Sequence, residues 1–187
     1  MKHLEAVPNI LTGSRFLLVP VLIDLFSIEQ TTRVEALSFA VFIVAALTDL
    51  VDGYLARKYQ SESVFGKLMD PLADKALVAT ALIMLIPLGR VAAWVCLLII
   101  CREMIVTGFR GLAATTGKVM AAGILGKYKS ACQYVGLGFL IFPHEMLAIP
   151  YQYQIGTFLI YISLVLALWS GGVYFYNLRG IFFETAQ

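Results

Sequence analysis

Residues 49–57 read DLVDGYLAR and residues 66–74 read GKLMDPLAD, and these two stretches decide the architecture expected for the chain. They place four carboxylates at the edges of two long apolar segments that otherwise exclude charge, and these are Asp49, Asp52, Asp70 and Asp74. On an α-helix, residues three or four positions apart lie on the same face, so each pair of acids shares one face of its helix. Two such helices lying side by side would gather all four acids at one point.

Four acids at one point need a compensating charge, because like charges at close range cannot all stay ionised. Carboxylate oxygens are hard ligands, so the cluster predicts one or two divalent cations, Mg²⁺ or Mn²⁺. Two such ions about 4 Å apart form the usual clamp on a phosphoryl group undergoing in-line displacement. The two stretches are therefore interpreted as an active site with four metal ligands, Asp49, Asp52, Asp70 and Asp74.

Simpler structural roles account for single acids of this cluster. Asp70 precedes Pro71, and proline is favoured at the first position of a helix, so Asp70 is also a candidate N-cap. Asp49 or Asp52 is also suited to neutralise Arg57 at a membrane surface. Neither role explains four acids at this spacing with small residues among them.

The composition indicates a polytopic membrane protein. Of the 187 residues, 60% are hydrophobic and only 14% are charged, which is too apolar for a soluble domain. Six apolar blocks have about the length that crosses a bilayer, namely Ile10–Phe26, Ala36–Leu55, Leu72–Leu88, Val91–Ala114, Ala131–Phe142 with its flanks, and Ile155–Phe175. The expected fold is an all-α bundle of six transmembrane helices, a single domain over residues 1–187, with a short interfacial helix in residues 1–7.

The placement of basic residues predicts the orientation in the membrane. One side of a six-span zigzag carries most of them, including Lys2, Arg57, Lys58, Lys67, Arg110, Lys118, Lys127, Lys129 and Arg179. The other side has only Arg33 and Arg90. The positive-inside rule then places both termini and the acidic cluster at the cytoplasmic face of a bacterial-type cytoplasmic membrane. Basic loops favour anionic lipid headgroups, and no feature indicates nucleic-acid binding.

The expected fourth span contains charges far from water. Arg102 and Glu103 lie about 16 Å from its outer end at 1.5 Å per residue, and charges that deep line a cavity or pair with each other. Thr107 and Arg110 follow Glu103 on the same helix face. For Glu103, a structural pair with Arg102 and a role in the cavity both remain open. Arg110 is interpreted as a phosphate ligand, because its guanidinium matches phosphate oxygens.

Two polar connections are expected at the cytoplasmic face. Lys58–Lys67 is expected to be a loop, and residues 111–129 are expected to form the longest cytoplasmic stretch. A solvated loop explains Lys118 as well as substrate binding does. Lys127 opens the expected fifth span at the height of the acidic cluster, so a binding role is favoured there.

The full pattern D-x2-D-G-x2-A-R-x8-G-x3-D-x3-D resembles the signature of the CDP-alcohol phosphotransferase family, and every fixed position is matched. The likeness extends to Pro8–Arg15, which looks like the amino-terminal segment of that family. Arg102–Arg110 and Gly126–Gln133 resemble the branch that acts on glycerol 3-phosphate. The resemblance therefore covers nearly the whole chain.

This resemblance implies a reaction in which an alcohol attacks the β-phosphorus of a CDP-lipid and CMP leaves, with two metals bridging the pyrophosphate oxygens. Asp74 would share a metal and act as general base on the alcohol. The implied CDP-binding residues are Asn9, Thr12, Gly53, Ala56, Arg57 and Gly66, of which Gly53 and Ala56 leave room for a flat group. The expected ligands of the acceptor phosphate are Arg110, Lys127, Thr107 and Lys118.

The expected function is transfer of the phosphatidyl group from CDP-diacylglycerol to sn-glycerol 3-phosphate, by a homodimer among membrane lipids. Inositol phosphate and serine remain open as acceptors. Outside the family, an intramembrane prenyltransferase or a divalent-cation carrier would also place acids in a helical bundle. Release of pyrophosphate in place of CMP would identify the first, and metal flux without turnover would identify the second.

Overall fold

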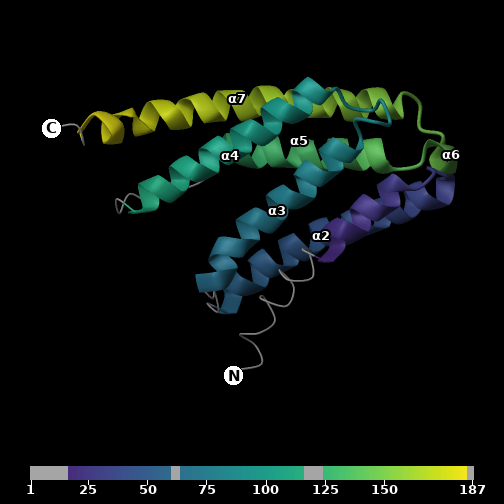
Figure 1. Ribbon diagram of the computed structural model, residues 1–187, viewed down its shortest axis with the longest axis horizontal. Helices are drawn as coiled ribbons and strands as arrows, with labels where there is room; N and C mark the ends of the chain where they lie inside the picture. Colours follow the sequence, from purple (N-terminus) through teal and green to yellow (C-terminus); the bar gives the residue numbers. More distant parts are fainter. Residues whose placement is uncertain (1–16, 60–63, 116–123, 185–187) are drawn as a thin grey trace.

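The computed structural model describes the backbone of residues 17–59, 64–115 and 124–184, and within them the side chains of residues 17–48, 72–111 and 124–176. All of the described secondary structure is helical, which confirms the all-α prediction (Figure 1). A helix over Leu17–Ser27 is followed by α2 (Thr32–Tyr59), α3 (Val64–Met84), α4 (Ala93–Thr115), α5 (Ile124–Ile141), the short α6 (His144–Leu147) and α7 (Gln152–Glu184).

The helices around the acidic motif are longer than the sequence pattern predicted. The predicted loop Lys58–Lys67 is wrong over most of its length, because α2 continues to Tyr59 and α3 begins at Val64. Asp70 therefore lies inside α3, and its interpretation as an N-cap is wrong. Pro71 also lies inside α3, where it cannot donate a backbone hydrogen bond to the preceding turn. Helix propagation adds one backbone hydrogen bond per residue, so a helix readily extends past its apolar block.

The same correction applies to the predicted cytoplasmic stretch 111–129. Helix α4 continues to Thr115 and α5 begins at Ile124, so Lys127 and Lys129 lie in the first turns of a helix. Helix α3, in contrast, ends at Met84, before the expected Leu88. Gly89 follows with a φ of 68°, in the left-handed region that glycine adopts without strain, and this turn reverses the chain into α4.

Helices α5 and α7 lie side by side along their length (Figure 1). Glycines permit this close approach, since a Cβ atom added to Gly156 would lie only 2.7 Å from Leu140 Cγ and 3.1 Å from the carbonyl oxygen of Gly136. At the start of α7, the buried Gln152 amide donates hydrogen bonds to the carbonyl oxygens of Phe139 and Phe142, at 2.9 and 2.6 Å. The pair α5–α7 is the support against which the other helices pack.

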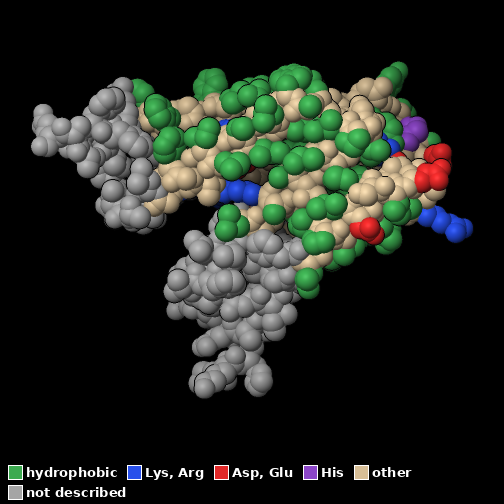
Figure 2. Space-filling model, in the orientation of Figure 1, with side chains coloured by type: hydrophobic (Ala, Val, Ile, Leu, Met, Phe, Trp, Pro, Cys, Tyr) green, Lys and Arg blue, Asp and Glu red, His purple; other side chains and the backbone are tan. Residues whose placement is uncertain are grey.

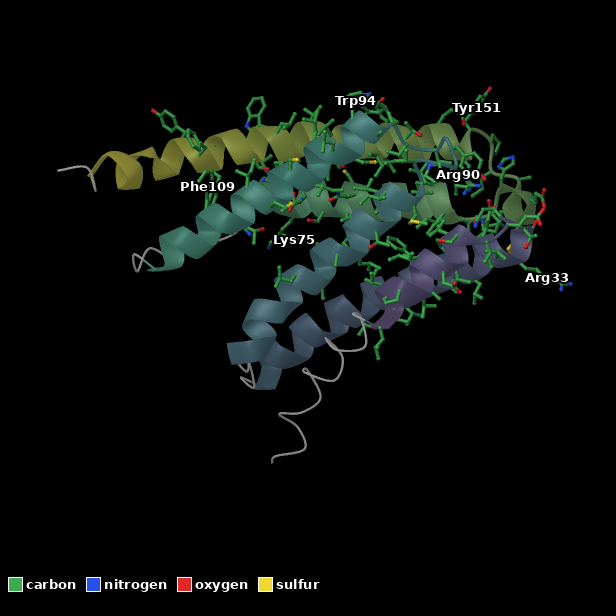
Figure 3. The ribbon with its side chains drawn as sticks, in the orientation of Figure 1. Arg33, Lys75, Arg90, Trp94, Phe109 and Tyr151 are labelled. Atoms are coloured by element: carbon green, nitrogen blue, oxygen red, sulfur yellow. The ribbon has the colours of Figure 1, made fainter. Side chains whose placement is uncertain are left out.

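The end of the bundle near α6 is tied together by polar contacts around Arg90, between α3 and α4. Its guanidinium pairs with Glu35 of α2, donates to the carbonyl oxygen of Leu140 at 2.7 Å, and stacks 4.5 Å from the ring centroid of Tyr153 (Figure 3). The apolar core lies beside this network, and its fully buried members include Leu22, Phe42, Leu82, Leu85, Leu137 and Leu140. These contacts hold α2, α5 and α7 together at this end of the bundle.

The outer surface of the described helices is apolar. Figure 2 shows hydrophobic side chains over most of the face, with acidic side chains gathered near α6. Large exposed side chains include Leu97, Phe158, Val165 and Trp169, each more than 60% exposed. Among the described residues, one helix, Gln152–Tyr176, is long and apolar enough to cross a membrane by length and composition. The arrangement of six spans stays a prediction, and the predicted interfacial helix in residues 1–7 lies outside the described residues.

Candidate active site

A cavity of about 1400 Å³ has its polar end away from α6 and continues between α2 and α5 as far as Leu147 of α6 and Ile149. Its polar end is formed by α3, α4, the first turns of α5 and the last described part of α7. The charged side chains there are Asp74, Lys75, Arg102, Glu103, Arg110, Lys127 and Lys129. Five cations thus face two carboxylates among the described lining residues, so this part of the cavity attracts anions.

The inner arm of the cavity is apolar. Residues of α2 spaced three and four apart face residues of α5 with the same spacing, as expected for two apolar helix faces. The lining side chains from α2 are Phe39, Phe42, Ile43, Ala46 and Leu47, and those from α5 are Val135, Gly138 and Phe139, followed by Phe142 directly after the end of the helix. From Tyr134 to Phe142 the arm extends about 12 Å at 1.5 Å per residue. One cavity therefore joins a cationic end to an apolar channel.

Of the four motif aspartates, Asp74 is the one whose side chain the structure describes. The backbones of Asp49 and Asp52 lie in α2 and that of Asp70 lies in α3, so the helical spacing behind the predicted pairs is present. Helix α2 packs against α3. The side chains of Asp49, Asp52 and Asp70 lie outside the described set, and within that set no group of three or more His, Cys, Asp or Glu residues gathers as a metal site.

Asp74 is held by a residue that sequence reasoning missed. The hydroxyl of Tyr134 on α5 donates a hydrogen bond to Asp74 Oδ1 on α3. The Tyr134 ring packs against the fully buried Phe42 of α2, with ring centroids 5.9 Å apart. Three helices therefore meet at this aspartate. The signal was present in the helical spacing of α5, because Tyr134 lies two turns after Lys127, on the face that lines the cavity.

Glu103 binds two cations. Its Oε1 accepts from Arg102 Nη1 at 2.7 Å and from Lys129 Nζ at 2.6 Å, and all three side chains are largely buried. The structural pair with Arg102 is thus present, and Lys129 joins it from α5. Arg102 also donates to the Ala167 carbonyl oxygen and to Ser170 Oγ, both at 2.8 Å, which connects α4 to α7.

Close contact between Arg102 and α7 depends on a small residue. A Cβ atom added to Gly171 would lie 3.3 Å from Arg102 Nε, so the glycine leaves room for the guanidinium. Gly171 therefore permits close contact between α4 and α7, and its neighbour Gly172 has no such role. A Cβ atom on Gly172 would meet no atom within 4 Å.

Thr107 is part of a chain of hydrogen bonds. Lys75 Nζ donates to Thr107 Oγ1, and the Thr107 hydroxyl donates to the carbonyl oxygen of Glu103 at 2.6 Å. Lys75 was not predicted as a site residue, although it directly follows Asp74. Its ammonium lies within electrostatic range of four other charged groups in the cavity, those of Asp74, Glu103, Arg110 and Lys129.

Arg110 and Lys127 line the mouth of the same cavity, as the sequence predicted for two residues that bind one phosphate. The guanidinium of Arg110 lies 5.5 Å from the ring centroid of Tyr174, and it makes no hydrogen bond to another described residue. Lys127 is exposed. Both cations are therefore available to an anion. Other predicted site residues, Asn9, Thr12 and Lys118, lie outside the described residues, and Gly53, Ala56, Arg57 and Gly66 are described as helical backbone alone.

Comparisons with known proteins agree with this geometry. The family model for CDP-alcohol phosphatidyltransferase matches residues 5–169, and dependence on a divalent cation is general to that family. A Bacillus subtilis protein named CDP-diacylglycerol–glycerol-3-phosphate 3-phosphatidyltransferase is 36% identical over 183 residues, covering 90% of this chain and 93% of its own. A Rickettsia prowazekii protein of the same name is 37% identical over 169 residues, with the same two coverages.

A relative with a different name is equally similar. A rice protein named cardiolipin synthase (CMP-forming) is 36% identical over 188 residues, covering 91% of this chain and 56% of its own length. Overall sequence identity therefore does not distinguish between the two named activities. The distinction has to come from the residues of the cavity.

Proposed function

Because the chain belongs to the CDP-alcohol phosphatidyltransferase family, we propose that it transfers the phosphatidyl group of CDP-diacylglycerol to sn-glycerol 3-phosphate and releases CMP. The observation that supports this most directly is the single cavity with a cationic end and an apolar arm. A lipid with a phosphorylated headgroup and a soluble phosphorylated alcohol both find complementary chemistry there. The chain would act as an integral enzyme of the cytoplasmic membrane.

The apolar arm supports a lipid donor. Its walls of Phe39, Phe42 and Ile43 on one side and Gly138 and Phe142 on the other offer no charged group to an acyl chain. The arm begins beside Asp74, so a chain lying in it would leave the headgroup phosphates at the polar end. An acyl chain lying in the arm would be removed from water, and burial of its apolar surface would stabilise the bound lipid.

The cations at the mouth support a phosphorylated acceptor. Arg110 and Lys127 are unpaired among the described residues, and guanidinium and ammonium groups bind phosphate oxygens through charge-assisted hydrogen bonds. Thr107 and Lys118 complete the proposed acceptor site. Glycerol 3-phosphate carries the doubly charged phosphate that such a site favours, whereas serine lacks a phosphate for these residues to bind.

The acids fit a pair of divalent cations. Carboxylate oxygens are the ligands that Mg²⁺ and Mn²⁺ prefer, and Asp74 Oδ2 accepts no hydrogen bond from the residues that the structure describes. Asp49, Asp52, Asp70 and Asp74 would hold the ions. When bound, the ions would neutralise charge that develops on the pyrophosphate.

The residues of the chain would then perform the remaining steps. Arg110 and Lys127 hold the acceptor phosphate, so that the acceptor hydroxyl lies near Asp74. Asp74 accepts the proton of that hydroxyl while the hydroxyl oxygen attacks the β-phosphorus of the CDP-lipid. CMP leaves from the nucleotide site, for which the proposed residues are Asn9, Thr12, Gly53, Ala56, Arg57 and Gly66.

The membrane arrangement is part of the same proposal. The exposed apolar side chains of α4 and α7 support placing these helices in lipid. Six spans with both termini and the active site at the cytoplasmic face are proposed from the distribution of Lys and Arg along the sequence. A soluble acceptor would enter from the cytoplasm, and the lipid donor would enter from the inner leaflet. The homodimer implied by the family resemblance is also proposed.

The test is a transferase assay on the full-length protein in mixed micelles. CDP-diacylglycerol is supplied with sn-glycerol 3-phosphate, inositol phosphate or serine, and both CMP and the lipid product are measured. We expect CMP and phosphatidylglycerophosphate with glycerol 3-phosphate, at least tenfold faster than with the other acceptors, and no turnover after chelation of divalent cations. Turnover with another acceptor alone would contradict the acceptor assignment, and release of pyrophosphate would contradict the reaction class.

The rice relative supports a second candidate, a CMP-forming synthesis of cardiolipin. The same assay with phosphatidylglycerol in place of glycerol 3-phosphate tests it. Phosphatidylglycerol carries one negative charge on a phosphodiester, whereas glycerol 3-phosphate carries a doubly charged phosphate. The two cations Arg110 and Lys127 favour the more highly charged, soluble acceptor.

A further inference from the structure

Tyr134 lies at the boundary between the two parts of the cavity. On α5 it follows Ser130 by one turn on the polar side and precedes Gly138 by one turn on the apolar side, and all three line the cavity. Its hydroxyl reaches across to α3 and donates to Asp74 Oδ1. No step of the proposed reaction has used this contact.

We propose that Tyr134 is a positioning residue that fixes the carboxylate of Asp74 for metal binding and proton transfer. This inference rests on the proposed function. The hydrogen bond engages Oδ1, and Oδ2 accepts no bond from the described residues, so one carboxylate oxygen is left for a metal ion or for the acceptor proton. Partners of metal-binding carboxylates orient those ligands, and their loss commonly costs 10- to 100-fold in metal affinity or activity.

The packing around Tyr134 holds its ring in place, as a positioning residue requires. The ring is partly buried and packs against the apolar core, with Phe42, which is fully buried, as its aromatic neighbour. The backbone of α3 at Asp74 is also fixed by packing, because Ala73 and Leu77 on the same helix are buried. A hydroxyl on a fixed ring restricts the rotamers of the carboxylate before any ligand binds, and such preorganisation is the usual requirement for a precise site.

The position of Tyr134 on α5 adds a second consequence. The same helix carries Lys127 and Lys129 at the polar end of the cavity, so the hydrogen bond joins the helix that would bind the acceptor to the carboxylate that would deprotonate it. Loss of the bond should therefore impair the chemical step more than it impairs the binding of either substrate.

The experiment compares Tyr134→Phe with the unchanged protein in detergent micelles. Phenylalanine keeps the ring and its contact with Phe42 and removes only the hydroxyl. Binding of Mn²⁺ to the purified protein is measured from the loss of the electron paramagnetic resonance signal of free Mn²⁺. Steady-state kinetics at saturating Mn²⁺ give kcat and both KM values. We expect a rise in the Mn²⁺ dissociation constant of about tenfold or more, a similar fall in kcat, and both KM values within about twofold.

The matched control is Tyr174→Phe. Tyr174 is a buried tyrosine of the same cavity whose hydroxyl has no hydrogen-bond partner among the described residues. Its replacement should leave Mn²⁺ binding unchanged, so a general effect of losing a phenol from the cavity is excluded. Thermal unfolding, followed by circular dichroism, should be unchanged in Tyr174→Phe. In Tyr134→Phe it should stay cooperative with a slightly lower midpoint, because the ring is kept and one hydrogen bond between α3 and α5 is lost.

Three results distinguish failure of this inference from failure of the proposed function. If the unchanged protein is active and Asp74→Asn loses Mn²⁺ binding, while Tyr134→Phe binds Mn²⁺ and turns over normally, the positioning role is refuted and the function stands. A rise in KM alone, without a change in Mn²⁺ binding, would also refute it. If the unchanged protein releases no CMP with any acceptor, the proposed function itself is refuted.

Discussion

Single residues at the polar end of the cavity divide into paired and unpaired cations. Arg102 and Lys129 are buried and bound to Glu103, and Lys75 is bound to Thr107. Arg110 and Lys127 have no such partner among the described residues. A buried ion pair that loses one member leaves an uncompensated charge, so the paired cations are suited to hold the helices together. The unpaired ones are suited to bind an incoming anion.

Arg110→Ala should weaken the binding of glycerol 3-phosphate and leave the binding of CDP-diacylglycerol nearly unchanged. A lost charge-assisted contact to phosphate costs about 1.5–3 kcal/mol, which corresponds to a rise in KM for glycerol 3-phosphate of roughly tenfold to a hundredfold. The KM for CDP-diacylglycerol should stay nearly constant. The measurement is steady-state kinetics, varying one substrate at a time. Arg33→Ala is the matched control, because Arg33 is exposed at the far end of the molecule (Figure 3). A change confined to the lipid KM would show that the two subsites are assigned the wrong way round.

Asp52→Asn should abolish turnover without unfolding the protein. The substitution keeps the size of the side chain and removes the charge that a divalent cation needs. Four uncompensated acids would repel one another in the metal-free protein, so loss of one charge should not destabilise it. Activity and thermal unfolding are measured on the same preparation. Substantial turnover by well-folded Asp52→Asn protein would contradict its role as a metal ligand.

Pairs of helices decide how much space the site has. Helices α5 and α7 approach closely where glycines face the partner helix, whereas α2 and α5 stand apart and leave the apolar arm between them. In lipid, small residues promote helix association because van der Waals packing replaces the hydrophobic effect as the driving force. The distribution of small and large residues on the two faces of α5 thus determines which neighbour is close and which is distant.

Gly156→Ala should destabilise the pair α5–α7. The added methyl group would lie 2.7 Å from Leu140 Cγ and 3.1 Å from a backbone oxygen, so one of the helices must shift. Overpacking of this kind costs about 1–3 kcal/mol. Gly172→Ala on the same helix is the control, since its methyl group would meet no atom within 4 Å. Thermal unfolding of the two variants is compared, and equal midpoints would contradict the close contact.

Gly138→Leu should shorten the acyl chains that the enzyme accepts. A Cβ atom at this position would lie 3.7 Å from the Phe39 ring, which is ordinary contact, so Gly138→Ala should behave normally. A leucine side chain would project into the apolar arm. We expect at least a tenfold loss of kcat/KM with long-chain CDP-diacylglycerol and a much smaller loss with short chains. Gly172→Leu, which lies outside the cavity, is the control. Equal losses for both chain lengths would mean that the arm does not hold the chain.

In the described part of the molecule, charge gathers at one end of the cavity. Arg90, Glu35 and Gln152 tie α2, α5 and α7 together near α6, beside the apolar core. The cations of the cavity lie toward the other end, and the apolar arm runs back to Leu147 of α6. A soluble phosphorylated acceptor would therefore meet the cationic end, and a lipid chain would meet the apolar arm.

Labelling of single cysteines tests the orientation of the whole molecule. In a background without the natural cysteines, a membrane-impermeant maleimide should label Ser61→Cys and Gly117→Cys from the cytoplasmic side and Arg33→Cys from the opposite side. The excess of Lys and Arg on one side of the zigzag is the physical basis of this expectation. Inverted and right-side-out vesicles provide the two orientations. Labelling of all three positions from one side would contradict the six-span arrangement.

The regular spacing of residues allowed the long helices and part of the candidate site to be predicted from the sequence alone. The helical repeat placed Asp70 with Asp74, and Glu103 with Thr107 and Arg110, on shared faces, and the apolar blocks located the long helices. These features depend on local geometry, which each segment carries within itself. Helix ends were predicted less well, at Tyr59, Val64 and Ile124, because a helix continues as long as its backbone bonds are favourable, whatever the polarity of the next residue.

Contacts between distant residues were decided by the tertiary structure. Sixty positions separate Tyr134 from Asp74, and twenty-six separate Lys129 from Glu103, and no local pattern relates the members of either pair. Lys127 was predicted to bind the acceptor phosphate and is exposed beside the cavity, whereas Lys129, for which no binding role was predicted, is buried and donates to Glu103. Which face of α5 meets its neighbours depends on packing such as that of Gly136 against Gly156 of α7, a match of shapes between two helices that exists only once both have folded.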